Sequence, residues 1–286
     1  MPTTILLTFV AMVAFAANSL LARVALAGGT IDAVSFTAIR LVSGAVALAA
    51  LLVIQHGPAA LRRRPGHPPG NWPSALALLA YALAFSLAYL RLGAATGALI
   101  LFAAVQGSMV AWGIFRRDRP TPPELAGLAI AFAAFVYLLL PGLHTPDLLG
   151  SLLMITSGIA WGVYSLRGRG TGDPLAETAG NFVRAALPCL PLLAAPLLGG
   201  HAGSHGILLA TISGVATSGL GYAIWYRALP RLSTTQAATV QLTVPIIAAT
   251  GAVAVLSEPL TPRLVIAATC ILGGVACSIL SRRPAA

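Results

Sequence analysis

The chain has 286 residues, of which 58% are hydrophobic and 8% are charged, and its mean hydropathy is +0.89. A soluble domain carries about 25% charged residues, so this composition excludes an ordinary soluble fold and indicates a protein whose apolar faces contact lipid. The net charge of +10 comes entirely from Arg, and because the Arg residues form short clusters between apolar stretches, we exclude nucleic acid as a partner.

Apolar stretches long enough to cross a bilayer recur along the whole chain. A helix needs about 20 mainly apolar residues to cross the hydrocarbon layer. The predicted spans are 3–26, 33–54, 72–92, 94–114, 123–142, 148–168, 176–198, 206–228, 234–256 and 260–281. The first span has no basic residue before it and is longer than the apolar region of a signal peptide, so we interpret it as part of the mature protein. We therefore predict an all-α membrane protein with ten transmembrane helices.

The Arg residues are divided unequally between the two sides of the predicted spans. With the N-terminus placed in the cytoplasm, twelve Arg residues fall in cytoplasmic loops and the C-terminal tail. The opposite side holds three, which are Arg23, Arg91 and Arg263. This excess follows the positive-inside rule. It predicts a multi-pass protein of the inner membrane with both termini in the cytoplasm.

The two halves of the chain match in register at charged and proline positions as well as at apolar ones. The matched pairs include Asp118 with Glu258 and Pro122 with Pro262 at an offset of 140, and Arg23 with Arg167 and Arg40 with Arg184 at an offset of 144. Each half contains five predicted spans, so the second half must be inverted in the membrane. We predict two repeats, residues 1–143 and 144–286, and such inverted repeats are typical of secondary transporters.

Three short motifs support this interpretation. They are Ala160-Trp161-Gly162-Val163-Tyr164-Ser165 at the start of the second half, Pro245 in the ninth span, and Ser257-Glu258-Pro259-Leu260 before the last span. Together, at these spacings, they resemble the drug/metabolite transporter (DMT) superfamily in its ten-helix EamA-type branch. The resemblance covers nearly the whole chain. It implies a basket-like fold with a central cavity lined by the first, third, fourth, sixth, eighth and ninth helices.

The first half departs further from the family pattern than the second. It has Phe15-Ala16-Ala17-Asn18-Ser19 where the family often has a Trp-Gly pair, Val105 where the equivalent of Pro245 would lie, and Asp118 where Glu is usual. Among subgroups we favour the bacterial exporters of aromatic and other neutral amino acids (the YddG type). The alternative is a multidrug, nucleobase or sugar-type carrier of the same superfamily.

Polar and aromatic residues deep in the spans are the candidates for lining the cavity. Amide and hydroxyl groups in hydrocarbon need partners, so they face protein or water. Aromatic rings suit apolar substrates and can hold an ammonium group. For each residue, packing or an interhelical hydrogen bond is the alternative role. The candidates are Asn18, Ser19, Tyr81, Phe85, Gln106, Trp161, Tyr164, Tyr222, Gln241 and Thr243.

Five further residues are candidates for hinges or gates. Pro245 removes one helical hydrogen bond and predicts a kink that could serve as a hinge. Asp118 and Glu258 are matched acids at opposite membrane interfaces, where they are either gates or exposed loop acids. Arg40 and Arg184 are the charges well inside spans; they either snorkel and pack, or pair with a substrate carboxylate or a gate.

Residue types that are missing from the predicted spans also bear on which functions are plausible. No Asp or Glu lies in the middle of a predicted span, which argues against carboxylate-driven proton coupling and favours a facilitator or exchanger. No His/Cys cluster predicts a metal, and no cofactor is expected. No cluster of acids, bases and nucleophiles predicts an enzyme, and the spans are too apolar for a wide channel. We expect a monomer in the lipid bilayer that exports small-molecule metabolites, aromatic and other neutral amino acids first, by alternating access.

Overall fold

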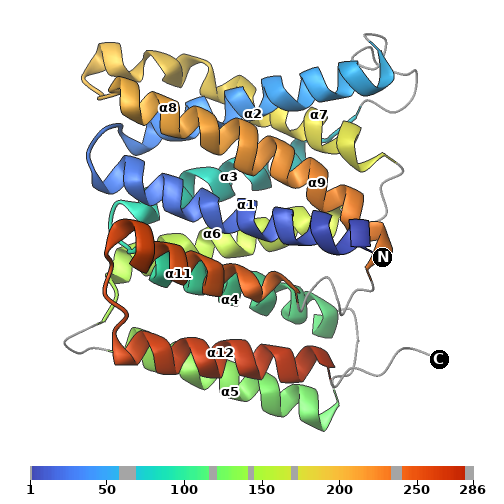
Figure 1. Cartoon of the computed structure of the whole chain (residues 1–286), viewed down its shortest axis with the longest axis vertical. Helices are drawn as coiled ribbons and strands as arrows, with labels where there is room; N and C mark the ends of the chain where they lie inside the picture. Colours follow the sequence, from blue (N-terminus) through green and yellow to red (C-terminus); the bar gives the residue numbers. More distant parts are fainter. Residues whose placement is uncertain are drawn as a thin grey trace.

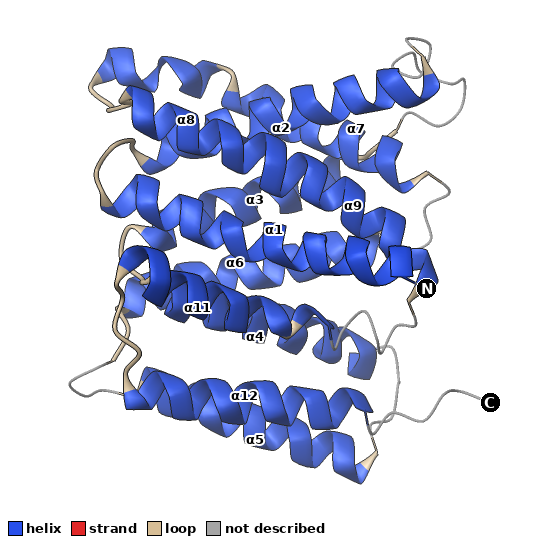
Figure 2. Cartoon of the chain, viewed as in Figure 1, coloured by secondary structure: helices blue, strands red, loops and turns tan. Residues whose placement is uncertain are grey.

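The computed structural model describes residues 2–57, 69–115, 121–140, 145–168, 173–232 and 240–280. Within these ranges the regular structure is helical, and no strand is present (Figure 2). The helices are α1 (Pro2–Ala27), α2 (Ala33–His56), α3 (Trp72–Tyr89), α4 (Ala94–Phe115), α5 (Pro122–Leu139), α6 (Leu148–Arg167), α7 (Pro174–Ala186), α8 (Ser204–Ile212), α9 (Gly221–Ala228), α11 (Thr243–Leu256) and α12 (Pro262–Leu280). The prediction of an all-helical chain is confirmed.

Many of these helices are long and apolar enough to cross a membrane. In the described part of the chain, six candidate spans are Thr3–Ala27, Ala33–His56, Trp72–Tyr89, Ala94–Gly113, Leu148–Arg167 and Ser204–Ala228. Shorter apolar helices lie at Ala129–Leu138, Thr243–Leu256 and Pro262–Cys277. The chain is therefore a multi-pass membrane protein by the length and composition of its helices. The count of ten spans stays a prediction.

On either side of α8, a segment departs from regular α-helix inside a predicted span. After α7 the chain continues as the 3₁₀ segments Leu187–Cys189 and Pro191–Leu198, because three prolines in this stretch lack the N–H that an α-helix requires. Between α8 and α9 the segment Ser213–Leu220 is π-helical, and it joins the two helices without a break. A π-helical turn is rare and is found frequently at functional sites.

The helices pair across the two predicted halves. α2 packs against α7, α4 against α11 and α5 against α12, so helices at equivalent positions of the two halves are neighbours (Figure 1). α3 packs against α6, and α1 packs against α9. In Figure 1, α1 begins and α12 ends at the same edge of the bundle.

At one end of the bundle, α2 holds the loop that precedes α8. Asp32 caps α2 by accepting a hydrogen bond from the Ser35 N–H at 2.8 Å. The same carboxylate accepts the His201 N–H at 3.1 Å, and the Asp32 N–H donates to the His201 carbonyl at 2.8 Å. Burial acts to raise the pKa of Asp32, but these hydrogen bonds outweigh it and hold the pKa below its ordinary value.

At the opposite end, α7 holds the loop that precedes α3 (Figure 1). The Glu177 carboxylate accepts the Gly70 N–H at 3.0 Å. The Asn181 side-chain carbonyl accepts the Asn71 N–H at 2.8 Å. α2 and α7 occupy equivalent positions of the predicted halves, as do α3 and α8. We call these two sets of hydrogen bonds clamps. They are reciprocal, because α2 binds the loop before α8 and α7 binds the loop before α3.

Close packing of α2 against the π-helical segment yields a stability prediction. A Cβ at Gly214 would lie 2.0 Å from Ser43 Oγ and 2.3 Å from the Arg40 carbonyl oxygen. We expect Gly214→Ala to lower the free energy of unfolding by about 1–3 kcal/mol, because the two helices must move apart. The measurement is the unfolding temperature of the detergent-purified protein.

The matched control is Gly273→Ala in α12, where a Cβ would meet nothing within 4 Å. We expect that variant to be as stable as the wild type or slightly more stable, since Ala favours helix over Gly. Equal unfolding temperatures for the two variants would contradict the close approach at Gly214.

Candidate functional site

A small cavity lies where helices of both predicted halves meet. Its volume is about 20 Å³. A space of that size holds about one water molecule and no organic substrate, so the cavity is closed in this structure. α1, α3, α4, α6, α9 and the π-helical segment contribute the lining residues, which are Phe15, Asn18, Ser19, Tyr81, Phe85, Leu101, Phe102, Trp161, Thr217 and Tyr222.

Aromatic rings form most of the cavity wall. The ring centroid of Trp161 lies 4.9 Å from that of Tyr81 and 4.8 Å from that of Tyr222. Phe15 meets Trp161 and Tyr222 edge-on, at 6.3 and 5.7 Å. These separations are those of favourable aromatic pairs. The rings of four helices, α1 and α3 of the first half and α6 and α9 of the second, therefore close the cavity by packing on one another.

Asn18 connects α1 to the π-helical segment and to α3. Its side-chain carbonyl accepts hydrogen bonds from Ser213 at 2.7 Å and Thr217 at 3.2 Å. Its amide donates to the Tyr81 hydroxyl at 3.4 Å. The side chain is 5% exposed, so these bonds replace the water that a buried amide lacks.

Arg40 of α2 lies directly beside the Tyr81 and Phe85 rings and is 1% exposed. Its Nη2 donates to the Tyr81 hydroxyl and its Nε donates to the Ser218 hydroxyl, both at 3.0 Å. The guanidinium carbon lies 5.2 Å from the ring centroid of Tyr81 and 4.9 Å from that of Phe85, which are cation–π distances. The charge is thus held inside the protein and does not extend to an end of the bundle.

Arg184 matches Arg40 in the sequence repeat but has a different environment. Its Nη1 donates to the Pro69 carbonyl at 2.5 Å and to the Gly180 carbonyl at 3.0 Å. It therefore joins α7 to the loop before α3, and the structure does not bring it to the cavity.

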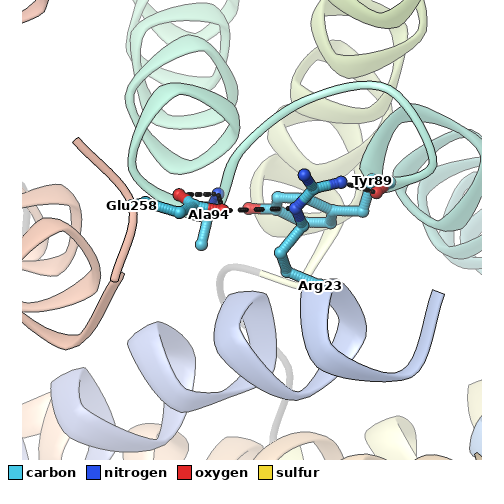
Figure 3. Close-up of polar contacts among 4 residues, drawn as sticks. All are labelled: Arg23, Tyr89, Ala94 and Glu258. Carbon is cyan, nitrogen blue, oxygen red and sulfur yellow. Dashed lines mark hydrogen bonds and ion pairs between the residues drawn. The ribbon is translucent and has the colours of Figure 1, made fainter. Parts of the chain in front are cut away.

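Glu258, between α11 and α12, joins three elements at one end of the bundle (Figure 3). Its carboxylate accepts Arg23 Nε at 3.2 Å and the Ala94 N–H at 2.8 and 3.1 Å. Arg23 Nη1 also donates to the Tyr89 carbonyl at 3.1 Å. Because Ala94 is the first residue of α4, the carboxylate satisfies a free N–H at a helix N-terminus, where negative charge is favoured.

Backbone geometry allows this approach of Glu258. Ser257 ends α11 in the left-handed conformation, with φ 53°, which turns the chain toward α4. A Cβ at Gly93 would lie 2.8 Å from the Glu258 carboxylate, so a larger residue there would displace the carboxylate from this position. Asp118, the predicted counterpart of Glu258, lies outside the described residues.

At the other end, Arg167 of α6 donates to the Ser74 hydroxyl at 3.1 Å and to the Asn71 side-chain carbonyl at 3.3 Å. Tyr164 lies one turn before it and helps to line a second small cavity of about 10 Å³ at this end. The Tyr164 ring is also 5.5 Å from Trp161, so it links the two cavities.

Gln106 lies away from the central cavity. It is buried at the wall of a larger groove of about 900 Å³ between the α4–α6 pair and the α5–α12 pair. The rest of that wall is almost wholly apolar, with Phe115, Phe132, Phe135 and Ile159 among its side chains. A role for Gln106 in substrate binding stays a prediction.

The remaining candidates, Gln241, Thr243 and Pro245, lie at the start of α11. The chain is helical at Val240 and Gln241, turns at Leu242 and resumes as α11 at Thr243. Pro245 is buried and lacks the N–H that would bond to residue 241, which accounts for the interruption. Thr243 is exposed, and its hydroxyl donates to the Val240 carbonyl at 2.7 Å. These residues do not line the central cavity.

Several residues of this site escaped the sequence reasoning. Phe15 has no distinguishing context as a cavity residue, because it is one Phe in an apolar helix. Ser213, Thr217 and Ser218 form a run of small polar residues inside an apolar span, a signal that could have found them. Arg23 carried a signal too, since it matches Arg167 and lies on the Arg-poor side.

Comparisons with known proteins agree with this architecture. Residues 148–280 match the EamA-like transporter family. An uncharacterized protein of Pseudomonas aeruginosa is 51% identical over 284 residues, which cover 98% of this chain and 95% of that protein. An uncharacterized transporter of Archaeoglobus fulgidus is 27% identical over 167 residues, covering 57% of this chain and 59% of that protein. A protein crystal structure with 18% identity has a TM-score of 0.64 and covers 98% of this chain and 97% of its own, so the fold is shared.

The hydrogen bonds of Tyr81 yield a second stability prediction. Tyr81→Phe removes the hydroxyl that Arg40 and Asn18 both contact, and it leaves their donors buried. We expect a loss of about 1–3 kcal/mol in the free energy of unfolding. Thermal unfolding in detergent measures it. Tyr137→Phe removes the same atom from a 41% exposed side chain and should change little; similar losses in both variants would refute the role of the buried hydroxyl.

Proposed function

We propose that this chain, whose residues 148–280 match the EamA-like transporter family, is a secondary transporter that exports small metabolites across the inner membrane. The substrates that we favour are aromatic and other neutral amino acids. The observation that carries the proposal is the aromatic cavity at the meeting point of α1, α3, α6 and α9, with the Asn18 amide in its wall. Rings with one or two polar groups are the usual wall of a small-molecule site.

The helix pairing supports an inverted repeat. If residues 1–143 and 144–286 are related by a twofold axis in the membrane plane, helices at equivalent positions meet across that axis. The packing of α2 on α7, α4 on α11 and α5 on α12 fits this relation. The two reciprocal clamps, by Asp32 on one side and Glu177 on the other, fit it as well. We infer two such repeats, with both termini on the cytoplasmic, Arg-rich side.

Transport through a closed cavity requires that either end can open. At one end, the Arg23–Glu258–Ala94 contacts join α1, α4 and the connection between α11 and α12 (Figure 3). At the other end, Arg167, Ser74 and Asn71 join α6 to α3. We propose that these polar contacts break and reform in turn as the two repeats rock around the cavity, with the interruption before Pro245 as a hinge.

The function is tested by flux into proteoliposomes. We expect saturable uptake of labelled phenylalanine or another neutral amino acid, and none into liposomes without protein. Trp161→Ala should lower the flux of an aromatic substrate by roughly tenfold or more, since it removes about 2 kcal/mol of apolar contact. Trp112→Ala, a matched change at a 44% exposed side chain of α4, should leave the flux unchanged. No saturable flux for any amino acid would exclude the amino-acid proposal.

The gate at Glu258 is tested by access to the cavity. In a chain whose three cysteines (Cys189, Cys270 and Cys277) are replaced, the substitution Ser19→Cys reports on access to the cavity. We expect Glu258→Gln to speed its labelling by a membrane-impermeant thiol reagent, added on the Glu258 side, by roughly two- to fivefold. That factor corresponds to the about 0.5–1 kcal/mol of a partly exposed ion pair.

The matched control for that experiment is Asp147→Asn. This change weakens the more exposed Arg91–Asp147 ion pair, 3.5 Å long, at the same end of the bundle and keeps an N-cap side chain. Its labelling rate should equal that of the unmodified background. If both variants label alike, the Glu258 contacts are structural only.

A further inference from the structure

Arg40 is a buried cation without an acidic partner. Within the described residues, the ion pairs are Arg23–Glu258 and Arg91–Asp147, and neither includes it. The sequence offers no acid nearby, since no Asp or Glu lies in the middle of a predicted span. A guanidinium in the interior of a membrane protein is costly unless its charge is compensated.

The compensation that the protein provides is incomplete. Tyr81 and Ser218 accept one hydrogen bond each, and two aromatic faces add cation–π attraction. Nη1 is buried and has no hydrogen-bond partner in the described part of the chain. The Tyr222 hydroxyl lies close enough to interact with the guanidinium electrostatically. A buried donor of this kind needs an explanation, which can be a missing ligand.

The open donors have the geometry of a carboxylate site. A guanidinium has five N–H donors in one plane. Nε donates to Ser218 and Nη2 to Tyr81, Tyr222 interacts with the group as well, and Nη1 has no partner within hydrogen-bond distance in the described part of the chain. Nη1 and Nη2 together form the edge of a guanidinium that can bind the two oxygens of a carboxylate in parallel. Tyr81 and Tyr222 touch this group and also line the cavity, so the guanidinium lies one side chain away from it.

The surroundings hold Arg40 in place. Where α2 crosses the π-helical segment, Gly44 and Gly214 allow backbone contact, and a Cβ at Gly44 would lie 3.0 Å from the Gly214 carbonyl oxygen. The same segment supplies Ser218 to Nε. The guanidinium is therefore fixed beside the aromatic rings of the central cavity.

We propose that the central cavity takes small carboxylates with an apolar or aromatic body, and that Arg40 binds the carboxylate. The cluster of Phe15, Tyr81, Trp161 and Tyr222 packs on the body of the substrate. None of the residues that line the cavity is acidic, so an amino group on the substrate contributes less than the carboxylate. This assignment rests on the proposed function, because it names the substrate class of the same cavity.

Three related probes separate the two substrate charges. Phenylalanine carries both groups, 3-phenylpropionate lacks the amine, and phenethylamine lacks the carboxylate. With the full-length protein in detergent, we expect the two carboxylates to quench tryptophan fluorescence saturably and to bind roughly tenfold or more tighter than phenethylamine. Absence of binding by both carboxylates, or phenethylamine binding as tightly as phenylalanine, would overturn the assignment.

Variants of Arg40 locate the carboxylate. We expect Arg40→Met to lose roughly tenfold to a hundredfold in affinity for both carboxylates and to bind phenethylamine as before. Arg40→Lys, which keeps the charge but not the planar fork, should be intermediate. Arg91→Met, at an exposed end, should match the wild type. Wild-type affinity of Arg40→Met for the carboxylates would overturn the proposal; if that variant does not fold, the probe comparison on the wild type decides.

Flux measurements distinguish this inference from the function on which it rests. Binding of both carboxylates without flux refutes transport and leaves the anion site standing. Saturable phenylalanine flux with a KM that Arg40→Met does not change refutes the anion site and leaves transport standing.

Discussion

The need to satisfy polar groups away from water governs the centre of this protein. In hydrocarbon, an amide or guanidinium must find its partners within the protein. Asn18 and Arg40 both find them in Tyr81 and in hydroxyls of the π-helical segment. α1, α2 and α3 are thereby joined at one tyrosine hydroxyl, and the π-helical segment is joined to α1 and α2 through its own hydroxyls. Any movement that opens the cavity must exchange these hydrogen bonds for others. Substrate binding can therefore favour the open form by supplying new partners to the same groups.

The ends of the bundle use a second device, in which a carboxylate binds the backbone N–H groups of another element. Asp32 does so for the loop before α8, Glu177 for the loop before α3, and Glu258 for the start of α4. Such bonds are directional and charge-assisted, yet they lie at the interfaces, where water can replace them when they break. That combination suits contacts that must hold a closed form and still release it. The apolar faces between helices have no comparable alternative partner.

The sequence indicates which side chains gather in the interior better than it indicates how the helices around them are oriented. Asn18, Tyr81, Phe85, Trp161 and Tyr222 meet because large aromatic or amide side chains deep in apolar spans have few places to go except a shared interior. Gln106 could not be oriented, since α4 is apolar on every face and its sequence does not indicate which side meets lipid. The π-helical segment shifts the register of its hydroxyls, and no periodicity of 3.6 residues predicts that. The divergence of Arg40 and Arg184, matched in sequence, depends on tertiary neighbours alone.

The packed aromatic rings and a carboxylate substrate compete for the guanidinium of Arg40. Without substrate, the Tyr81 hydroxyl and two aromatic faces serve as partial partners for the charge. A carboxylate would add a full countercharge, but it must first displace the packed rings that now fill the space. The gain from ion pairing is therefore offset by the loss of aromatic contacts, and the net affinity is modest. Modest affinity is what a carrier requires, because a site that held its anion tightly would bind it without releasing it on the far side.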